Sequence, residues 1–189
     1  QKASTAFDLD SDGAQCLAQV ITYVRKARSV TRPEIATSTG LSRTLATKYI
    51  DVALELKLLQ SGEVGQSTGG RAPRLLNFNS NAGAILVAEL GATGFNVAAS
   101  DLNGNLLGTT FTRVEISEGP EVVLSLVESS FDDLVVSLKI KNLWGIGIGV
   151  PGPVEFATGL PISPPIMPGW DKFPVRERFS TKYKVPVWV

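Results

Sequence analysis

The chain has 189 residues, enough for one or two domains, and 43% of them are hydrophobic, as in an ordinary globular protein. Its 18 basic and 18 acidic residues cancel, and histidine is absent. The lack of histidine excludes the commonest acid–base catalyst, and with a single cysteine, Cys16, no Cys/His metal site or intrachain disulfide is expected. The chain begins with a polar stretch and has no apolar run long enough to span a bilayer, so we expect a cytoplasmic protein without membrane contact.

The neutral total hides an uneven distribution of charge. Residues 14–80 hold nine Lys or Arg and four Asp or Glu, a net charge of +5. Residues 81–189 hold eight basic and eleven acidic residues, a net charge of −3. The first part is therefore the candidate for contact with a polyanion, although scattered surface lysines would give the same sum.

The first predicted helix covers residues 14–27, after a loose leader at residues 1–13. Its apolar side chains recur with the spacing of one buried helical face, at Leu17, Val20, Ile21 and Val24. Basic residues at its end favour a helix terminus there, because the last turn of a helix attracts cations.

A second, shorter helix is predicted from Thr31 to about Thr39. Thr31 and Glu34 have the spacing of a capping box, and Pro33 falls in the first turn, where its missing N–H costs nothing. Gly40 then supplies a tight turn. The next helix begins directly after it.

Ser42 is predicted to cap this third helix. Its inward stripe consists of Ala46, Ile50, Ala53 and Leu54, with Tyr49 at the edge. The opposite side carries polar and basic side chains: Ser42, Arg43, Thr44, Thr47 and Lys48. These are residue types that read base edges and hold phosphates in a recognition helix. A solvated helix face accounts equally well for any one of them taken alone.

A β-hairpin is predicted after the third helix. Its strands are Leu58–Leu59 and residues 74–78, with a turn around Gly62 to Gly65. The tip, residues 66–71, combines glycines, which let the backbone approach a phosphate, with Arg71, which can enter a narrow minor groove; Arg74 lies at the base. A flexible solvent loop would explain the tip alone. Next to the helices, the pattern predicts that residues 14–80 form a winged helix-turn-helix DNA-binding domain.

The rest of the chain, residues 81–189, has the pattern of an α/β lobe. After a polar linker at residues 77–83, strands are predicted at residues 84–90, 95–100 and 106–114, and the D-L-N-G-N stretch between the last two indicates a hairpin. A helix follows at residues 120–139, and then a glycine-rich buried strand at residues 143–150.

Several segments of this lobe resemble the ROK family of repressors and sugar kinases. They are A-I-L-V-A-E-L-G-A-T from residue 84, N-L-W-G-I-G-I-G-V-P-G-P-V from residue 142, P-G-W from residue 168 and K-V-P-V-W-V from residue 184. The preceding helix-turn-helix pattern is that of the family's repressor branch. The resemblance implies a ribonuclease H-like (actin/hexokinase ATPase) fold and a sugar or sugar-phosphate effector. It also implies that residues 81–189 are the first lobe of an incomplete ROK domain.

The sequence departs from the family's kinases at two places. The kinases carry an acidic-Gly-Gly-Thr-Lys type of hairpin that cradles ATP phosphates. Here Glu89, Gly91 and Thr93 keep its outline, but Ala92 adds a methyl group and Gly94 removes the basic side chain, so a plain β-turn is the favoured interpretation. The family's catalytic Asn-Asp pair follows the strand on which this chain stops, at Val189. We therefore expect part of a longer protein, no cofactor and no kinase activity in the given residues.

Only part of the family's sugar site is expected here, at Gly152, Pro164 and Pro165; a rigid Pro/Gly turn without a ligand explains these residues equally well. Together the patterns predict a sequence-specific DNA-binding regulator of sugar-metabolism genes, a repressor that is controlled by a sugar and acts as a homodimer or higher homo-oligomer on double-stranded DNA. The alternatives are a ROK sugar kinase with an appended helix-turn-helix domain, and a winged helix that docks a protein.

Overall fold

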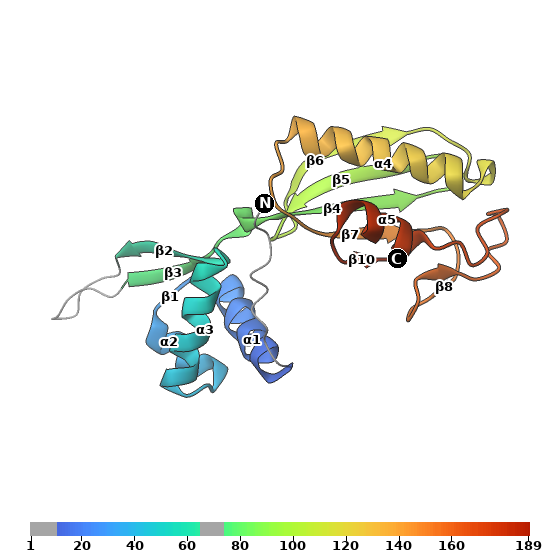
Figure 1. Cartoon of the computed structure of the whole chain (residues 1–189). Helices are drawn as coiled ribbons and strands as arrows, with labels where there is room; N and C mark the ends of the chain where they lie inside the picture. Colours follow the sequence, from blue (N-terminus) through green and yellow to red (C-terminus); the bar gives the residue numbers. More distant parts are fainter. Residues whose placement is uncertain (1–10, 65–73) are drawn as a thin grey trace. The chain divides into compact units, whose positions relative to one another are not determined.

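The computed structural model describes residues 11–64 and 74–189, and divides the chain into two compact units, Gln1–Ser80 (unit 1) and Asn81–Val189 (unit 2) (Figure 1). The predicted wing tip at residues 66–71 and most of the predicted leader lie outside the described residues. No helix in the described parts of the chain combines the length and hydropathy needed to cross a bilayer.

The described residues of unit 1 form three helices and a small antiparallel sheet in the order β1-β3-β2. Its elements are α1 (Ser11–Ala27), β1 (Ser29–Val30), α2 (Arg32–Thr39), α3 (Arg43–Glu55), β2 (Leu59–Val64) and β3 (Arg74–Phe78). The predicted helices are all present. The first begins at Ser11, inside the stretch predicted to be a leader.

The sheet of unit 1 differs from its prediction in two places, the turn after β2 and the additional strand β1. The predicted turn does not begin at Gly62, because β2 continues through it to Val64. The pairing of β2 with β3 shifts register between Ser61 and Val64, so Gly62 lies at an irregularity within the strand and not in a turn. The strand predicted at residues 74–78 is present as β3, so only the overlapping start of the predicted linker at residue 77 is corrected. The third strand, β1, was not predicted, since two residues are too few to show a periodicity.

One hydrophobic core holds unit 1 together. The fully buried side chains of Val20 and Val24 from α1, Ile35 from α2 and Ile50 from α3 all belong to it. The sheet contributes Leu59 and Leu76, and Cys16 is half-buried. The helical spacing of these residues is what a buried stripe on each helix requires.

Unit 2 contains a five-stranded sheet in the order β10-β7-β4-β5-β6. Its larger elements are β4 (Ala84–Leu90), β5 (Phe95–Asp101), β6 (Leu106–Thr112), α4 (Pro120–Ser137), β7 (Leu143–Gly149), α5 (Val175–Tyr183) and β10 (Val187–Trp188). Short 3₁₀ turns lie at Ser80–Ala82 and Ile116–Glu118, and β8 (Val154–Glu155) pairs with β9 (Leu160–Pro161). The hairpins β4–β5 and β5–β6 are antiparallel, whereas β7 runs parallel to β4 and β10 parallel to β7.

The predicted order of strand, strand, strand, helix, strand is present in unit 2, with ends that differ by a few residues. The hairpin turn at D-L-N-G-N is also present: the Asp101 carboxylate accepts hydrogen bonds from the N–H groups of Asn103 and Asn105, both at 2.9 Å. Gly104 has a φ of 86° there, which favours glycine. The helix α5 and the hairpin β8–β9 were not predicted.

Both helices of unit 2 pack on the same face of its sheet. The alternating residues Leu86, Ala88 and Leu90 of β4 share one core with α4 and α5, where Phe131 and Phe179 meet edge to face with ring centroids 5.9 Å apart. Figure 1 shows α4 running along this face. On the opposite face, Trp188 is 60% exposed and lies across Gly145, where an added Cβ would be 2.9 Å from its ring.

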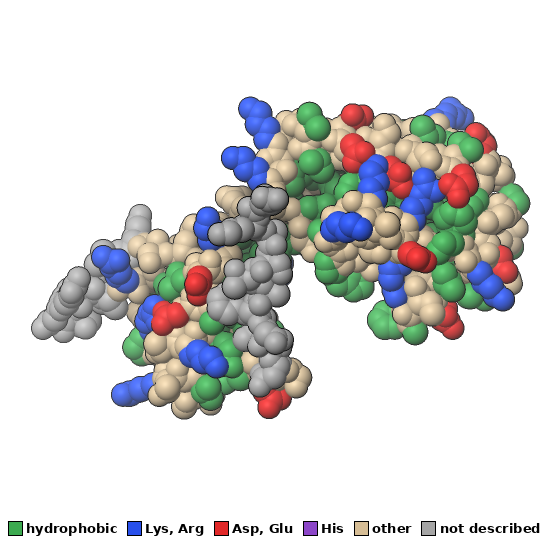
Figure 2. All heavy atoms as spheres, in the orientation of Figure 1, with side chains coloured by type: hydrophobic (Ala, Val, Ile, Leu, Met, Phe, Trp, Pro, Cys, Tyr) green, Lys and Arg blue, Asp and Glu red, His purple; other side chains and the backbone are tan. Residues whose placement is uncertain are grey.

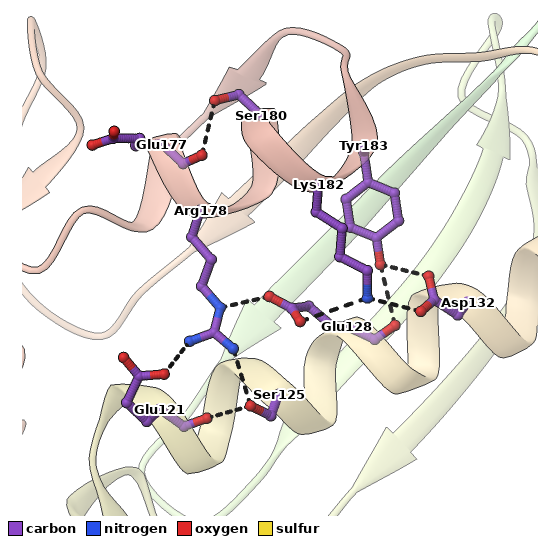
Figure 3. A network of polar contacts seen from close by, with 9 residues as sticks. All are labelled: Glu121, Ser125, Glu128, Asp132, Glu177, Arg178, Ser180, Lys182 and Tyr183. Atoms are coloured by element: carbon purple, nitrogen blue, oxygen red, sulfur yellow. Dashed lines mark hydrogen bonds and ion pairs between the residues drawn. The ribbon is translucent and has the colours of Figure 1, made fainter.

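A network of polar side chains joins α5 to α4 (Figure 3). Arg178 donates from Nε to Glu128 at 2.5 Å, from Nη1 to Glu121 at 2.6 Å and from Nη2 to the Ser125 hydroxyl at 3.0 Å. Partial burial disfavours the charged guanidinium, but the hydrogen bonds to Glu128 and Glu121 outweigh it and raise the pKa of Arg178 above its ordinary value. Arg178 is thus the centre of the network.

The other end of this network involves Lys182 and Tyr183. Lys182 contacts Asp132 at 2.8 Å, and the Tyr183 hydroxyl donates to Asp132 at 2.8 Å and lies 3.2 Å from the Glu128 carbonyl oxygen. Burial, followed by the hydrogen bond to Asp132, raises the pKa of Tyr183 well above its ordinary value. Tyr183 therefore stays neutral and acts as a hydrogen-bond donor.

We predict that Arg178→Ala lowers the free energy of unfolding of unit 2 by about 1–3 kcal/mol, because Glu128 would be left partly buried without its main partner. The side chain of Glu128 is 17% exposed, whereas Lys182 is 37% exposed. Lys182→Ala, the control, should therefore cost less than about 1 kcal/mol. Urea unfolding followed by tryptophan fluorescence measures both, since Trp144, Trp170 and Trp188 all lie in unit 2. Equal losses in the two variants would contradict the prediction.

Candidate nucleic-acid interface

The start of α2 is fixed by a reciprocal capping box. Glu34 Oε2 accepts hydrogen bonds from the Thr31 N–H at 2.7 Å and the Thr31 hydroxyl at 2.8 Å, while the Glu34 N–H donates back to the hydroxyl at 3.4 Å. The bond from the Thr31 backbone, and then that from its side chain, lower the pKa of Glu34. The predicted capping box and the Pro33 in the first turn are confirmed.

The turn from α2 to α3 uses Gly40 and Ser42. Gly40 has a φ of 71°, in the left-handed region that favours glycine at the end of a helix. The Ser42 hydroxyl accepts a hydrogen bond from the Leu45 N–H at 3.3 Å and so caps α3, as predicted. The end of α2 and the start of α3 are therefore both capped within a few residues, and the cap at Ser42 defines where α3 begins.

The inner side of α3 determines which of its side chains face outward. Ala46, Ile50 and Ala53 are buried in the core of unit 1, as predicted. Tyr49 was expected at the edge, but it is only 5% exposed and belongs to the core, because it follows Ala46 by three residues and precedes Ala53 by four and so lies within the buried stripe. The outer side is correspondingly narrower than the sequence suggested.

The predicted recognition residues of α3 are exposed together on its outer side. They are Ser42, Arg43, Thr44, Thr47 and Lys48. The Lys48 ammonium lies 5.1 Å from the centre of the Tyr49 ring, a cation–π contact that orients it while leaving the charge outside. Figure 2 shows basic side chains at several places on the visible face of unit 1, with acidic ones between them. This surface can offer hydrogen-bond donors and positive charge to an anionic partner.

Two hollows of about 320 Å³ each lie beside these residues and share Arg32 and Pro33. One is lined by Arg43 and Thr47 of α3, and the other by Arg74 at the exposed start of β3. Sequence reasoning missed Arg32, although its place at the first position of α2 could have indicated an outward side chain. The predicted wing residue Arg71 lies outside the described residues.

The predicted degenerate phosphate loop is a tight turn between β4 and β5. The Gly91 N–H donates to the Gly94 carbonyl oxygen at 2.8 Å, which closes the turn, and the Ala92 carbonyl oxygen accepts from the Ile116 N–H at 2.9 Å. Glu89 and Thr93 are exposed on either side of Gly91. The turn's backbone groups are thus partly occupied by hydrogen bonds within the protein.

Two of the three predicted sugar-site residues lie in contact. A Cβ added to Gly152 would be 2.8 Å from Cβ of Pro164, so the two loops pack directly against each other at this point. Pro164 is buried, whereas Pro165 is exposed. A hollow of about 560 Å³ in unit 2 is lined by other residues, among them Phe156, Arg176 and Trp188, none of which was predicted. Among residues 11–64 and 74–189, no group of His, Cys, Asp and Glu side chains is arranged to hold a metal ion.

The sequence profile of the ROK family matches residues 85–189, more than half of the chain. The chain belongs to the ROK family. A xylose repressor from Caldicellulosiruptor bescii is 31% identical over 165 residues, which cover 79% of this chain and 40% of that repressor. The xylose repressor of Bacillus subtilis is 24% identical over 168 residues, covering 88% of this chain and 43% of the relative. These relatives confirm the predicted resemblance to the repressor branch of the family.

A solved structure of a ROK family transcriptional regulator, a homologue of the E. coli MLC protein, has the same fold. It superimposes with a TM-score of 0.78 at 18% identity and covers 95% of this ROK chain and 46% of its own. This likeness supports the predicted ATPase-like fold of unit 2. The present ROK chain spans less than half the length of this regulator and of the two xylose repressors.

Thr31→Ala should destabilise α2 by about 1 kcal/mol at neutral pH, because it removes the capping acceptor. The pKa of Glu34 is lower in the folded state, so the stabilisation from its ionised form is present above the unfolded pKa and is lost as pH falls through the folded one. Thr31→Ala removes the hydrogen bond from the hydroxyl to Glu34 but keeps the stronger one from the backbone N–H, so its cost should shrink only in part between about pH 6 and about pH 3.5. Amide hydrogen exchange in α2 measures it.

The matched control for this prediction is Thr37→Ala, in the middle of the same helix. Thr37 is exposed and its hydroxyl donates to the Pro33 carbonyl oxygen at 3.1 Å, a bond that the helix does not need. This variant should leave the exchange rates in α2 almost unchanged at both pH values. A pH-independent cost of Thr31→Ala would contradict the role given to the hydrogen bond between the Thr31 hydroxyl and ionised Glu34.

Proposed function

We propose that this chain belongs to a sugar-responsive transcriptional repressor, which binds double-stranded DNA through unit 1. Unit 1 serves as a winged helix-turn-helix: α2 and α3 form the helix pair, α3 enters the major groove, and β2 and β3 form the base of the wing. The ROK-type unit 2 takes part in sensing a sugar or sugar phosphate. The repressor acts as a homodimer or higher homo-oligomer, so that two copies of α3 read paired half-sites.

The observation that carries this proposal is the exposed outer side of a well-anchored α3. Arg43 and Lys48 supply positive charge, while Thr44 and Thr47 supply hydroxyl groups that can reach bases or phosphates. Both ends of the preceding turn are capped, so these side chains project from a rigid helix. A rigid presentation lowers the entropy cost of forming several contacts at once.

The distribution of charge supports the same role. Residues 14–80 carry nine basic and four acidic residues. Because DNA is a polyanion, such a unit gains affinity by releasing counterions, whatever the base sequence. Arg74 adds a basic group at the base of the wing, close to α2 in the lining of the same hollow.

The relatives support a regulatory rather than an enzymatic role. Two proteins that match most of the chain are named xylose repressors, and a ROK transcriptional regulator shares the fold. In unit 2, the turn at Gly91 has its own internal hydrogen bond, and Ala92 stands where a phosphate-binding hairpin favours a smaller residue. We therefore propose that unit 2 contributes Gly152, Pro164 and Pro165 to ligand sensing and does not transfer phosphate.

We predict that Arg43→Ala weakens binding to a selected DNA site by about 1–3 kcal/mol, because Arg43 contacts a base edge in the proposed complex. Lys48→Ala should weaken binding to selected and to mixed-sequence duplexes by the same factor, and it should reduce the slope of log affinity against log salt by about one. Fluorescence anisotropy with duplexes selected from a random pool, over a salt series, measures both effects.

Lys26→Ala is the matched control for this experiment, since it removes the same charge from the exposed surface of α1. It should change the affinity for selected DNA much less than Arg43→Ala. The proposed function fails if the chain selects no sequence from the pool, or if its affinity for DNA does not fall as the salt concentration rises.

A further inference from the structure

Arg32 lies on the side of unit 1 that is proposed to bind DNA, and it forms an ion pair with an acidic residue of α3. Its Nη2 donates to Asp51 Oδ1 at 2.7 Å. The two side chains are 42% and 57% exposed, so solvent reaches both partners. An exposed pair of this kind contributes little to stability, and a stronger anion can displace the carboxylate.

The position of Arg32 gives this pair a role beyond stability. Arg32 lines both hollows of the interface: in one it lies with Arg43 and Thr47, and in the other with Arg74. Arginines from α2, α3 and β3 therefore converge on one stretch of surface. Planar guanidinium groups bind phosphate oxygens through paired hydrogen bonds, so this convergence fits a nucleic-acid backbone.

Asp51 is placed to compete with that backbone. It follows Thr47 by four residues and Arg43 by eight, so the three side chains lie in a row along the outer side of α3. Arg43 and Thr47 extend this row toward the start of the helix, while the carboxylate of Asp51 holds Arg32 at its far end. A phosphate that binds Arg32 must replace this carboxylate. The negative charge of the carboxylate also repels the phosphate.

We propose that Arg32 contacts DNA phosphate and that Asp51 occupies it in the free protein, which lowers the affinity for DNA of any sequence. This inference rests on the proposed DNA-binding function. Its consequence is a uniform penalty: breaking the Arg32–Asp51 pair costs the same at a selected and at a mixed-sequence site, so it lowers the occupancy of both and leaves the ratio of the two affinities unchanged. Asp51 is in this sense a residue that limits the affinity for DNA without itself binding DNA.

The test uses Asp51→Asn, which frees Arg32, and Glu55→Gln, which removes an equal charge from the exposed last residue of the same helix. Asp51→Asn should raise the affinity for a short mixed-sequence duplex about fivefold, the value expected for losing a weak exposed pair. Glu55→Gln should raise it by no more than about twofold, through reduced general repulsion. Anisotropy titrations over a salt series measure both.

Arg32→Ala separates this proposal from general electrostatics. It should reduce the slope of log affinity against log salt by about one, and it should abolish the gain from Asp51→Asn when the two changes are combined. A selected duplex should gain about as much from Asp51→Asn as a mixed-sequence one, because the phosphate contact of Arg32 does not depend on the bases. Circular dichroism of each variant checks that the helices remain folded.

The inference is overturned if Asp51→Asn and Glu55→Gln have equal effects, or if the gain from Asp51→Asn persists in the Arg32→Ala background. In both cases the parent chain still binds DNA, so the proposed function would stand. Failure of the parent chain to bind any duplex would instead overturn the proposed function together with the inference.

Discussion

The burial of Ile50 is the constraint on which the interface of unit 1 depends. Its side chain is completely inaccessible to solvent within the core that α1, α2 and the sheet share. Because a helix turns by a fixed angle per residue, burying Ile50 with Ala46 and Ala53 fixes the rotation of α3 about its axis. The outward direction of Arg43 and Thr47 follows from this packing, whatever the partner is.

Unit 2 depends on a comparable division between two faces of its sheet. Alternation along β4 directs one set of residues to α4 and α5 and the other to the opposite face, where Val87 is 37% exposed. The helix α5 is short and polar outside its buried residues, so its place is specified both by Phe179 in the core and by the ion pairs of Arg178. Figure 2 shows acidic and basic side chains interspersed over this unit.

The sequence predicted what local patterns encode and missed what depends on distant partners. The helix pair α2 and α3 was predictable from the capping residues Thr31 and Ser42 and from the buried stripe on α3, because each of these signals involves only a few neighbouring residues. The strand β1 has no periodicity of its own and exists through its pairing with β3. The pairing of Arg32 with Asp51 joins residues 19 positions apart, and no local pattern could indicate it. The contact of Gly152 with Pro164 arises in the same way.

The central place of β3 in the small sheet has a mechanical consequence. This strand pairs with β1 on one side and β2 on the other, and it is the last strand of unit 1 before the chain continues to unit 2. A pull on the chain at Phe78 would load the hydrogen bonds on both edges of β3. Because Val30 is paired with Leu76 and directly precedes the capping residue Thr31, that pull would reach the start of α2 through the sheet.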